Sequence, residues 1–278
     1  MNLELQIIIA IVTFSLMLCV GLLSSLNEIK KNIFVFDKDF KVAVLSQMIL
    51  VPLITYICIT FFFDIDLEFK IFLMLIALAP GAVISTAYVN LSGGNTVLSL
   101  KLSFYLTILS AFTLPILFKI YNDSIIDGVN VDIIKAILKI SILVILPIFI
   151  GAKIKQKFSN LNNRLIKLIA VIILLFSSVI TFQIFNKDLT MEYLNKIPYM
   201  LILIIFFILS AALLGIKFKL KKENRITLII ETFMQNQAVV LTIGSITMPG
   251  YTLVVSSLLW MTIQFVFGYI FIFMNYKK

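Results

Sequence analysis

The sequence predicts an all-α, polytopic membrane protein, and three observations lead to this fold class. Hydrophobic residues make up 61% of the 278 positions and charged residues only 13%, whereas a water-soluble domain has about 25% charged residues. Apolar runs of about 20 residues, long enough to cross a bilayer, recur along the whole chain. The loops between these runs are short, so we expect a single transmembrane domain over 1–278.

The hydropathy pattern divides the chain into nine apolar segments, each of which we expect to be a transmembrane helix. The segments cover about residues 5–27, 41–63, 69–91, 95–121, 133–155, 163–185, 196–216, 225–247 and 250–274. The first segment has no basic residues before it and no small-residue cleavage site after it. We therefore interpret it as a helix and not as a signal peptide.

Basic residues lie mainly in one set of alternate loops. Of the 23 Lys and Arg residues, 17 lie in or beside the loops after the first, third, fifth and seventh segments and in the C-terminal tail. Because cytoplasmic loops accumulate Lys and Arg, we expect a multi-pass protein of the cell membrane with its N-terminus outside and its C-terminus in the cytoplasm. The same loops account for the net charge of +9 without a nucleic-acid partner.

The residue types that build zinc, thiol-redox and nucleophilic sites are scarce. The chain has no histidine, and its two cysteines, Cys19 and Cys58, each lie inside an apolar run. The sequence has no metal-ligand spacing, and the acidic residue discussed next has no apparent partner set for nucleophilic catalysis. We therefore expect neither an enzyme nor a bound cofactor.

Glu231 is the only one of the 14 acidic residues that lies well inside an apolar segment, about 10 Å from its start at 1.5 Å per residue. A charge at that depth costs about 3 kcal/mol on insertion scales, so it faces a cavity, an ion or a partner. A protonated carboxyl group that only bonds a neighbouring helix is the structural alternative. Gln235 and Asn236 follow one turn later, and several oxygens beside one carboxylate favour a small cation.

A second interruption lies in "LIALAPGAVISTAYVNLSGGN", where Pro80 and Gly81 follow an apolar run. Proline removes a backbone donor and clashes with the preceding turn. Open backbone at membrane depth occurs only where it is buried in protein or lines a cavity. Taken alone, the pair could be a simple kink, but Ser85 and Thr86 follow within two turns.

The two interrupted segments, 69–91 and 225–247, occupy corresponding places in the chain. If the first four helices match the last four, a first repeat (1–121) and a second repeat (133–274) have opposite directions across the membrane. The helix at 133–155 then has no counterpart. Paired interrupted helices in inverted halves are typical of the central site of a secondary transporter, so we expect one transmembrane transporter domain.

Several motifs along nearly the whole chain resemble the bile acid:sodium symporter family. They are "LMLCVGL", "DFKVAVLSQMILVPL", "APGAVIST", "GGNTVLSLKLS", "LPIFIGAKIK" and "ETFMQNQAVVL". The Pro-Gly break with its following Ser and the Glu-x-x-x-Gln-Asn pattern are the specific parts. The resemblance implies a panel domain and a core domain, with the third and eighth helices broken and crossing near the midplane. The chain is similar to a nine-helix bacterial member.

The resemblance also implies binding residues for sodium and substrate. The implied first sodium site consists of Ser85, Thr86, Ser99, Ser103 and Glu231. The implied second site consists of Gln47, Glu231 and Gln235, with the backbone oxygens of Thr232 and Met234. Asn236 would face the substrate. Carboxylate, hydroxyl and carbonyl oxygens are the ligands that hard cations prefer, and one shared carboxylate partly neutralises two sodium ions.

The chain departs from the family pattern in the implied first site. Thr86 stands where the family usually has Asn, and Ser103 where Thr is common; Ala82 replaces the second glycine after the proline. A hydroxyl at position 86 is shorter than an amide. One or two sodium ions per cycle therefore both remain open from the sequence.

The function implied is secondary active transport: sodium-coupled symport of an organic anion, bile-acid-like or a small carboxylate, into the cytoplasm by alternating access. The partners are sodium, that anion and the lipid bilayer. Two alternatives remain open from the residues. One is a proton-coupled or uncoupled anion carrier on the same scaffold, and the other is a non-transporting sensor that keeps the binding site.

Overall fold

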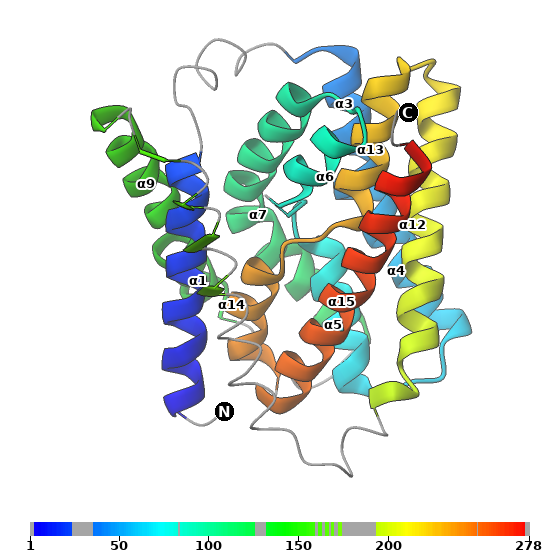
Figure 1. Cartoon of the computed structure of the whole chain (residues 1–278). Coiled ribbons are helices and arrows are strands. Elements are labelled where there is room, and N and C mark those ends of the chain that lie inside the picture. Colours follow the sequence, from blue (N-terminus) through cyan, green and yellow to red (C-terminus); the bar gives the residue numbers. More distant parts are fainter. Residues whose placement is uncertain are drawn as a thin grey trace.

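The computed structural model describes residues 3–23, 36–82, 84–125, 132–158, 193–248 and 250–275, with scattered residues between 161 and 173. Every regular element in these ranges is a helix (Figure 1). The elements are α1 (Leu3–Leu23), α3 (Lys38–Leu45), η1 (Ser46–Leu50), α4 (Val51–Ile57), η2 (Cys58–Phe62), α5 (Leu67–Leu78), α6 (Ser85–Leu91), α7 (Thr96–Ile125), α8 (Ile133–Ile140), η3 (Ser141–Ile145), α9 (Leu146–Lys157), α12 (Ile197–Lys217), α13 (Lys222–Phe233), α14 (Gln237–Thr247) and α15 (Gly250–Asn275), where η marks a π-helical stretch.

Five continuous helical stretches in the described part of the chain are long and apolar enough to cross a membrane. They are Lys38–Phe62, Thr96–Tyr121, Ile133–Lys157, Ile197–Lys217 and Gly250–Asn275. All five coincide with predicted segments, and shorter apolar helices cover Ile7–Leu22 and Gln237–Thr247. The predicted segment 163–185 lies largely outside the described residues. The prediction of an all-helical, polytopic membrane protein is thus confirmed, and the number nine stays a prediction.

Two of these stretches contain a π-helical turn just before a proline. In the first, Pro52 is the second residue of α4, and the N–H of Val51 donates to the carbonyl of Ser46 five residues back. Pro147 follows η3 in the same way. A proline cannot make the usual bond to the preceding turn, and a local π turn is one of the adjustments that give the freed backbone groups new partners in a membrane helix. The turn before Pro52 contains Gln47, which is buried.

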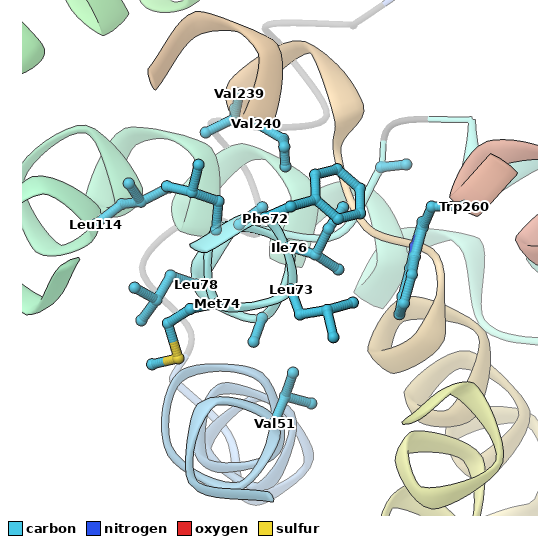
Figure 2. Packing of buried hydrophobic residues seen from close by; sticks show 14 of the residues in the cluster. Val51, Phe72, Leu73, Met74, Ile76, Leu78, Leu114, Val239, Val240 and Trp260 are labelled. Atoms are coloured by element: carbon cyan, nitrogen blue, oxygen red, sulfur yellow. The ribbon is translucent and has the colours of Figure 1, made fainter. Parts of the chain in front are cut away.

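Helix α5 lies at the centre of the hydrophobic core (Figure 2). Every residue from Ile71 to Leu78 is buried, as expected for a helix that is hydrophobic on all faces. Side chains from four other elements surround it: Val51 of α4, Leu114 of α7, Val239 and Val240 of α14 and Trp260 of α15. Helix α5, the first half of the third predicted helix, is therefore the element around which these helices pack.

The described helices form two groups. Helix α1 packs along α9 and η3, and these lie side by side at the left of Figure 1, away from α12, α13 and α15. The helices α3, α4, α6, α7, α12 and α15 pack around α5 and α13, whereas α8 contacts α7, α14 and η3. Helix α14 touches both groups, since it contacts α1, α8 and η3 on one side and α5 and α15 on the other. The boundary between the groups therefore passes along α14.

Both interrupted segments are broken helices in the structure. Helix α5 ends at Leu78, and Ala79 is extended with ψ 151° because the residue before a proline disfavours the helical region. Helix α13 ends at Phe233, and Met234 and Asn236 are extended with ψ 90° and 97°. Each break leaves backbone donors and acceptors without helical partners.

The two breaks supply hydrogen bonds to each other. The N–H of Ala82 donates to the carbonyl of Met234 across 2.7 Å, and the N–H of Asn236 donates to the carbonyl of Pro80 across 2.8 Å. Gly81 and Gln235 form an antiparallel bridge between these bonds. The structure therefore brings the two interrupted segments together at one crossing, as the sequence predicts.

Polar contacts also hold the starts of the broken helices at opposite ends of the bundle. At the start of α5, Glu68 accepts from the hydroxyl of Thr252 in α15 across 2.6 Å. At the start of α13, Asn224 accepts from the side chain of Asn95, just before α7, across 2.9 Å. In both cases the start of one broken helix is tied to the start of the helix that follows the other.

A leucine of α5 should contribute much more to stability than a leucine on the membrane-facing surface. Leu73 is fully buried (Figure 2), whereas Leu53 on α4 is 49% exposed. We expect Leu73→Ala to destabilise the fold by about 2–5 kcal/mol through loss of contacts and an unfilled cavity. Leu53→Ala should change the apparent Tm of the detergent-purified protein little. Equal losses in the two variants would contradict the central position of α5.

Candidate functional site

Glu231 lies two residues before the end of α13, and its side chain is fully buried. The helix must stop close to it because Met234 turns the chain into the extended crossing. The carboxyl group therefore lies beside the break and not along a continuous helix. Residues of α6, α7 and η1 reach the same point from other parts of the chain.

One carboxylate oxygen of Glu231 is surrounded by hydroxyl groups. Ser85 and Ser99 both donate to Glu231 Oε1, Ser99 across 2.5 Å. Because Ser99 uses its only hydrogen there, Thr86 must donate in the 2.8 Å contact between the two hydroxyls. Ser103 is buried beside the same carboxyl group, but its hydroxyl has no hydrogen-bond partner within the described residues. The five residues implied as a first sodium site thus lie together.

The two amides implied in the second site leave their oxygens free. Gln47 Nε2 donates to the backbone carbonyl of Glu231 across 2.5 Å, and Gln235 Nε2 donates to that of Thr232 across 2.8 Å. A carbonyl only accepts, so the nitrogen of each amide must face it. Gln47 Oε1, Gln235 Oε1 and Glu231 Oε2 are buried and have no hydrogen-bond partner among the residues that the structure describes.

The other two residues implied in the second site contribute backbone oxygens. The carbonyl of Thr232 accepts from Gln235, and that of Met234 accepts from Ala82 at the crossing. A carbonyl oxygen has two lone pairs, so both can accept once more. The hydroxyl of Thr232 donates to Leu228 across 2.7 Å, and it can therefore only accept in its 3.1 Å contact with Ser46.

Gly81 is required for the close approach of the crossing to Glu231. A Cβ atom at this position would lie 2.5 Å from Glu231 Oε2 and 3.0 Å from Gln47 Nε2. Real Cβ atoms essentially never come within 3.0 Å of another atom, so any side chain here would displace the carboxyl group. The free carboxyl oxygen of Glu231 and the amide group of Gln47 thus both lie against the position that a Cβ atom of residue 81 would occupy.

Asn236 caps the second half of the broken helix. Its Oδ1 accepts from the N–H of Ala238 across 3.1 Å, and its backbone N–H is used in the crossing. Its Nδ2 is buried and has no hydrogen-bond partner in the described ranges. A free amide donor at the start of α14 adds to the positive partial charge of a helix N-terminus, a combination that suits an anion.

The structure adds two residues that the sequence interpretation missed. Gln264 of α15 accepts from the backbone N–H of Gln235 across 3.1 Å, and Ser46 contacts Thr232. Both are buried. A single amide inside the otherwise apolar run 250–274 is the signal that could have indicated Gln264. Ser46 stands next to Gln47, and nothing in its own sequence context distinguishes it.

A small cavity lies against the crossing on the side of Gln47. Its volume is about 10 Å³, and its wall includes Pro80 and two hydroxyl residues of α7, Ser110 and Thr113. This space is roughly that of one water molecule. The Gln47 side of the crossing therefore has room for one small polar species beside this residue.

The donor set suits a hard cation and not a transition metal. Within the described residues, no three His, Cys, Asp or Glu side chains come together. The groups around Glu231 are hydroxyl, amide and carbonyl oxygens with one carboxylate. Such oxygen ligands are those of alkali and alkaline-earth ions, whereas imidazole and thiolate groups select zinc and its neighbours.

Comparison with known proteins identifies the family. Residues 7–193 match the sodium bile acid symporter family. The chain belongs to this family. It is a family of transporters and not of enzymes, so the resemblance indicated by the motifs is confirmed. The matched region of this symporter-family chain ends before α13, and it therefore includes the Pro80 break but not Glu231.

Two individual relatives extend the comparison of this symporter-family chain. The hepatic sodium/bile acid cotransporter of Homo sapiens is 26% identical over 182 residues, which cover 65% of this chain and 52% of that protein. The chain thus matches about half the length of the human relative. The protein of the same name from Rattus norvegicus is 26% identical over 290 aligned positions, covering 99% of this chain and 78% of that protein. This second match includes α13 and α14.

Substitution of Gly81 should remove sodium binding without unfolding the symporter-family protein. We expect Gly81→Ala to displace the Glu231 carboxyl group and to abolish the thermal stabilisation that sodium, compared with choline, gives the purified protein. Gly93→Ala is the control. Gly93 has φ +73° with no atom within 4 Å of a Cβ, so alanine there should cost about 1–2 kcal/mol of stability and leave the sodium effect unchanged. A full sodium effect in Gly81→Ala would argue against the crossing as the ion site.

Proposed function

We propose that this symporter-family protein is a secondary active transporter that couples sodium entry to the import of an organic anion. One observation carries the proposal: Glu231 Oε2, Gln47 Oε1 and Gln235 Oε1 are buried acceptor oxygens without donors among the described residues. Each such atom costs free energy if it stays unpaired. A sodium ion beside Gly81 would pair with these oxygens.

We assign the hydroxyl set around Glu231 Oε1 to a first sodium ion and the amide set around Oε2 to a second. The carboxylate would then be shared, so that each ion lowers the electrostatic cost of the other. Thr86 provides a single hydroxyl at the edge of the first set, bonded to Ser99 at 2.8 Å. The first ion would therefore be bound more weakly than the second, and transport with one sodium ion per cycle would depend on the second set alone.

The substrate class follows from the charge at the crossing. With sodium bound, Glu231 no longer repels an anion, and the free Nδ2 of Asn236 at the start of α14 can donate to a carboxylate or sulfonate. The two relatives are named for bile acids. We propose a bile-acid-like molecule or a smaller carboxylate as the substrate, with Asn236 as a contact.

Alternating access would use the boundary along α14. We propose that α1, α8 and α9 belong to a panel domain and that the helices around α5 and α13 form a core domain, with nine membrane helices in all and inverted repeats over 1–121 and 133–274. Relative movement of the two domains would expose the crossing first to one side of the membrane and then to the other. The asymmetry of basic residues favours a cytoplasmic C-terminus, and we propose that an inward sodium gradient drives import.

A proton-coupled carrier on the same scaffold is the second candidate. No Lys or Arg pairs with Glu231 within the described part of the chain, so its charge must be balanced by an ion or removed by a proton. Transport that follows a pH gradient and ignores sodium would favour this candidate. Transport that follows sodium at constant pH favours the first.

Removal of the charge at Glu231 should abolish sodium coupling. In proteoliposomes with a sodium gradient, radiolabelled cholate and a short-chain carboxylate serve as probes. We expect Glu231→Gln to lower the affinity for sodium at least about tenfold, equivalent to ~1.4 kcal/mol, and to abolish sodium-stimulated uptake. The variant should still fold, because an amide can occupy the same space.

Glu223→Gln is the matched control for this experiment. Glu223 lies in the first turn of the same helix and is exposed, so its substitution should leave the sodium dependence unchanged. If Glu231→Gln still shows uptake that rises with sodium, the proposed role of Glu231 is wrong. If both variants lose uptake equally, the effect is one of charge on α13 in general.

The proposed orientation is tested independently of transport. Reporter fusions after residue 1 and after residue 278 should give opposite signals, with the C-terminal reporter active only in the cytoplasm. An odd number of membrane helices leaves the two termini on opposite sides of the membrane. Reporters on the same side would contradict both the helix count and the inverted repeats.

A further inference from the structure

Lys139 places a charged group inside a membrane-spanning helix. It lies in α8, six residues after Ile133 and therefore about 9 Å along the span Ile133–Lys157. The side chain is half-buried, and its ammonium group donates to Ser245 Oγ of α14 across 2.6 Å. A lysine that extended to the membrane surface would not hold its ammonium group against a neighbouring helix.

The charge of Lys139 has no counter-ion among the residues that the structure describes. Two other buried lysines are balanced differently: Lys196 pairs with Asp66 at 2.7 Å, and Lys101 lies over the ring of Phe40 at 4.6 Å. Lys139 instead donates to the neutral hydroxyl group of Ser245, which satisfies one of its three N–H donors. Ionisable residues at such depth usually face a substrate or ion pathway.

Lys139 lies on the boundary between the two helix groups and contacts the helix that begins at the crossing. Helix α14 starts at the crossing, directly after Asn236, and contacts α1, α8 and η3 along its length. Ser245 lies two residues before the end of α14. Lys139 therefore faces the same helix whose first turn meets the proposed substrate, on the half of the bundle away from α13.

We propose that Lys139 determines the specificity of this transporter for anions: its ammonium group binds the carboxylate or sulfonate of the substrate when α8 and α14 separate. The proposal rests on the proposed function. The bond to Ser245 is charged only on its donor side, whereas a carboxylate or sulfonate forms the stronger N⁺–H···O⁻ type of bond and supplies a counter-ion, so the anion displaces Ser245. When the anion moves on to Asn236, the bond to Ser245 forms again and closes this half of the boundary.

The first test needs no substrate. In a background with Cys19→Ala and Cys58→Ala, Lys139→Cys is exposed in vesicles to a membrane-impermeant methanethiosulfonate reagent that carries a sulfonate. We expect the cysteine to react, because the boundary opens to water during the cycle. Lys135→Cys on the same helix, where the native side chain is 78% exposed, is the positive control. No reaction at position 139, with or without sodium, would overturn the proposal.

The second test measures anion binding by thermal shift in saturating sodium, with cholate and butyrate as probes. We expect Lys139→Met to weaken the affinity for the stabilising anion at least about tenfold, and Lys139→Arg to restore it. Ser245→Ala should keep anion binding because the charge remains. Lys135→Met, which removes a charge from the same helix, should have no effect.

The outcomes separate this proposal from the function on which it rests. Unchanged anion affinity in Lys139→Met would overturn the role of Lys139. Equal losses in Lys139→Met and Ser245→Ala would also overturn it, because the contact would then be only structural. If neither probe stabilises the native protein, the proposed substrate class is wrong, and the labelling experiment still decides whether Lys139 lies on the pathway.

Discussion

Every backbone polar group in the hydrocarbon region needs a partner within the protein, and this requirement is hardest to meet where a helix breaks. The structure meets it by pairing its two breaks through the Gly81–Gln235 bridge and the bonds on either side of it. This pairing requires the two extended stretches to run antiparallel and in contact. It also requires the surrounding helices to exclude lipid, which explains the burial of every residue from Ile71 to Leu78 in α5 and of the residues around Glu231.

The crossing concentrates acceptor oxygens where donors are scarce. Two serine hydroxyls satisfy one oxygen of Glu231, while the other oxygen and two amide oxygens have no partner within the described residues. A folded protein tolerates few such atoms, so the site and a bound cation depend on each other. A ligand that binds only the folded state raises its stability with concentration. If a cation binds here as we propose, ion binding and fold stability are coupled at the same residues, which is a physical basis for coupling an ion to a conformational cycle.

The two helix groups differ in how they are held. Within the central group, side-chain bonds tie Glu68 to Thr252 at one end and Asn95 to Asn224 at the other, in addition to the crossing itself. Between the groups, the ammonium group of Lys139 donates to the neutral hydroxyl of Ser245, a partner that the proposed anion would replace. A rigid centre and an exchangeable boundary suit rigid-body movement of one group against the other. The binding residues can then keep their geometry while access to them changes.

The sequence by itself determined that this protein spans a membrane, that it is helical, where its two helix breaks lie and to which family it belongs. These conclusions were possible because hydropathy, proline chemistry and the Glu231 motif are local properties. It also indicated most of the residues that meet at the crossing. Only the tertiary structure decided that the amide nitrogens of Gln47 and Gln235 are bonded while their oxygens are not, why Gly81 must lack a side chain, and that Ser46 and Gln264 join the site. These features depend on contacts between segments up to 186 positions apart. No local pattern specifies such contacts, since they arise from the packing of helices around a shared hydrogen-bonding requirement.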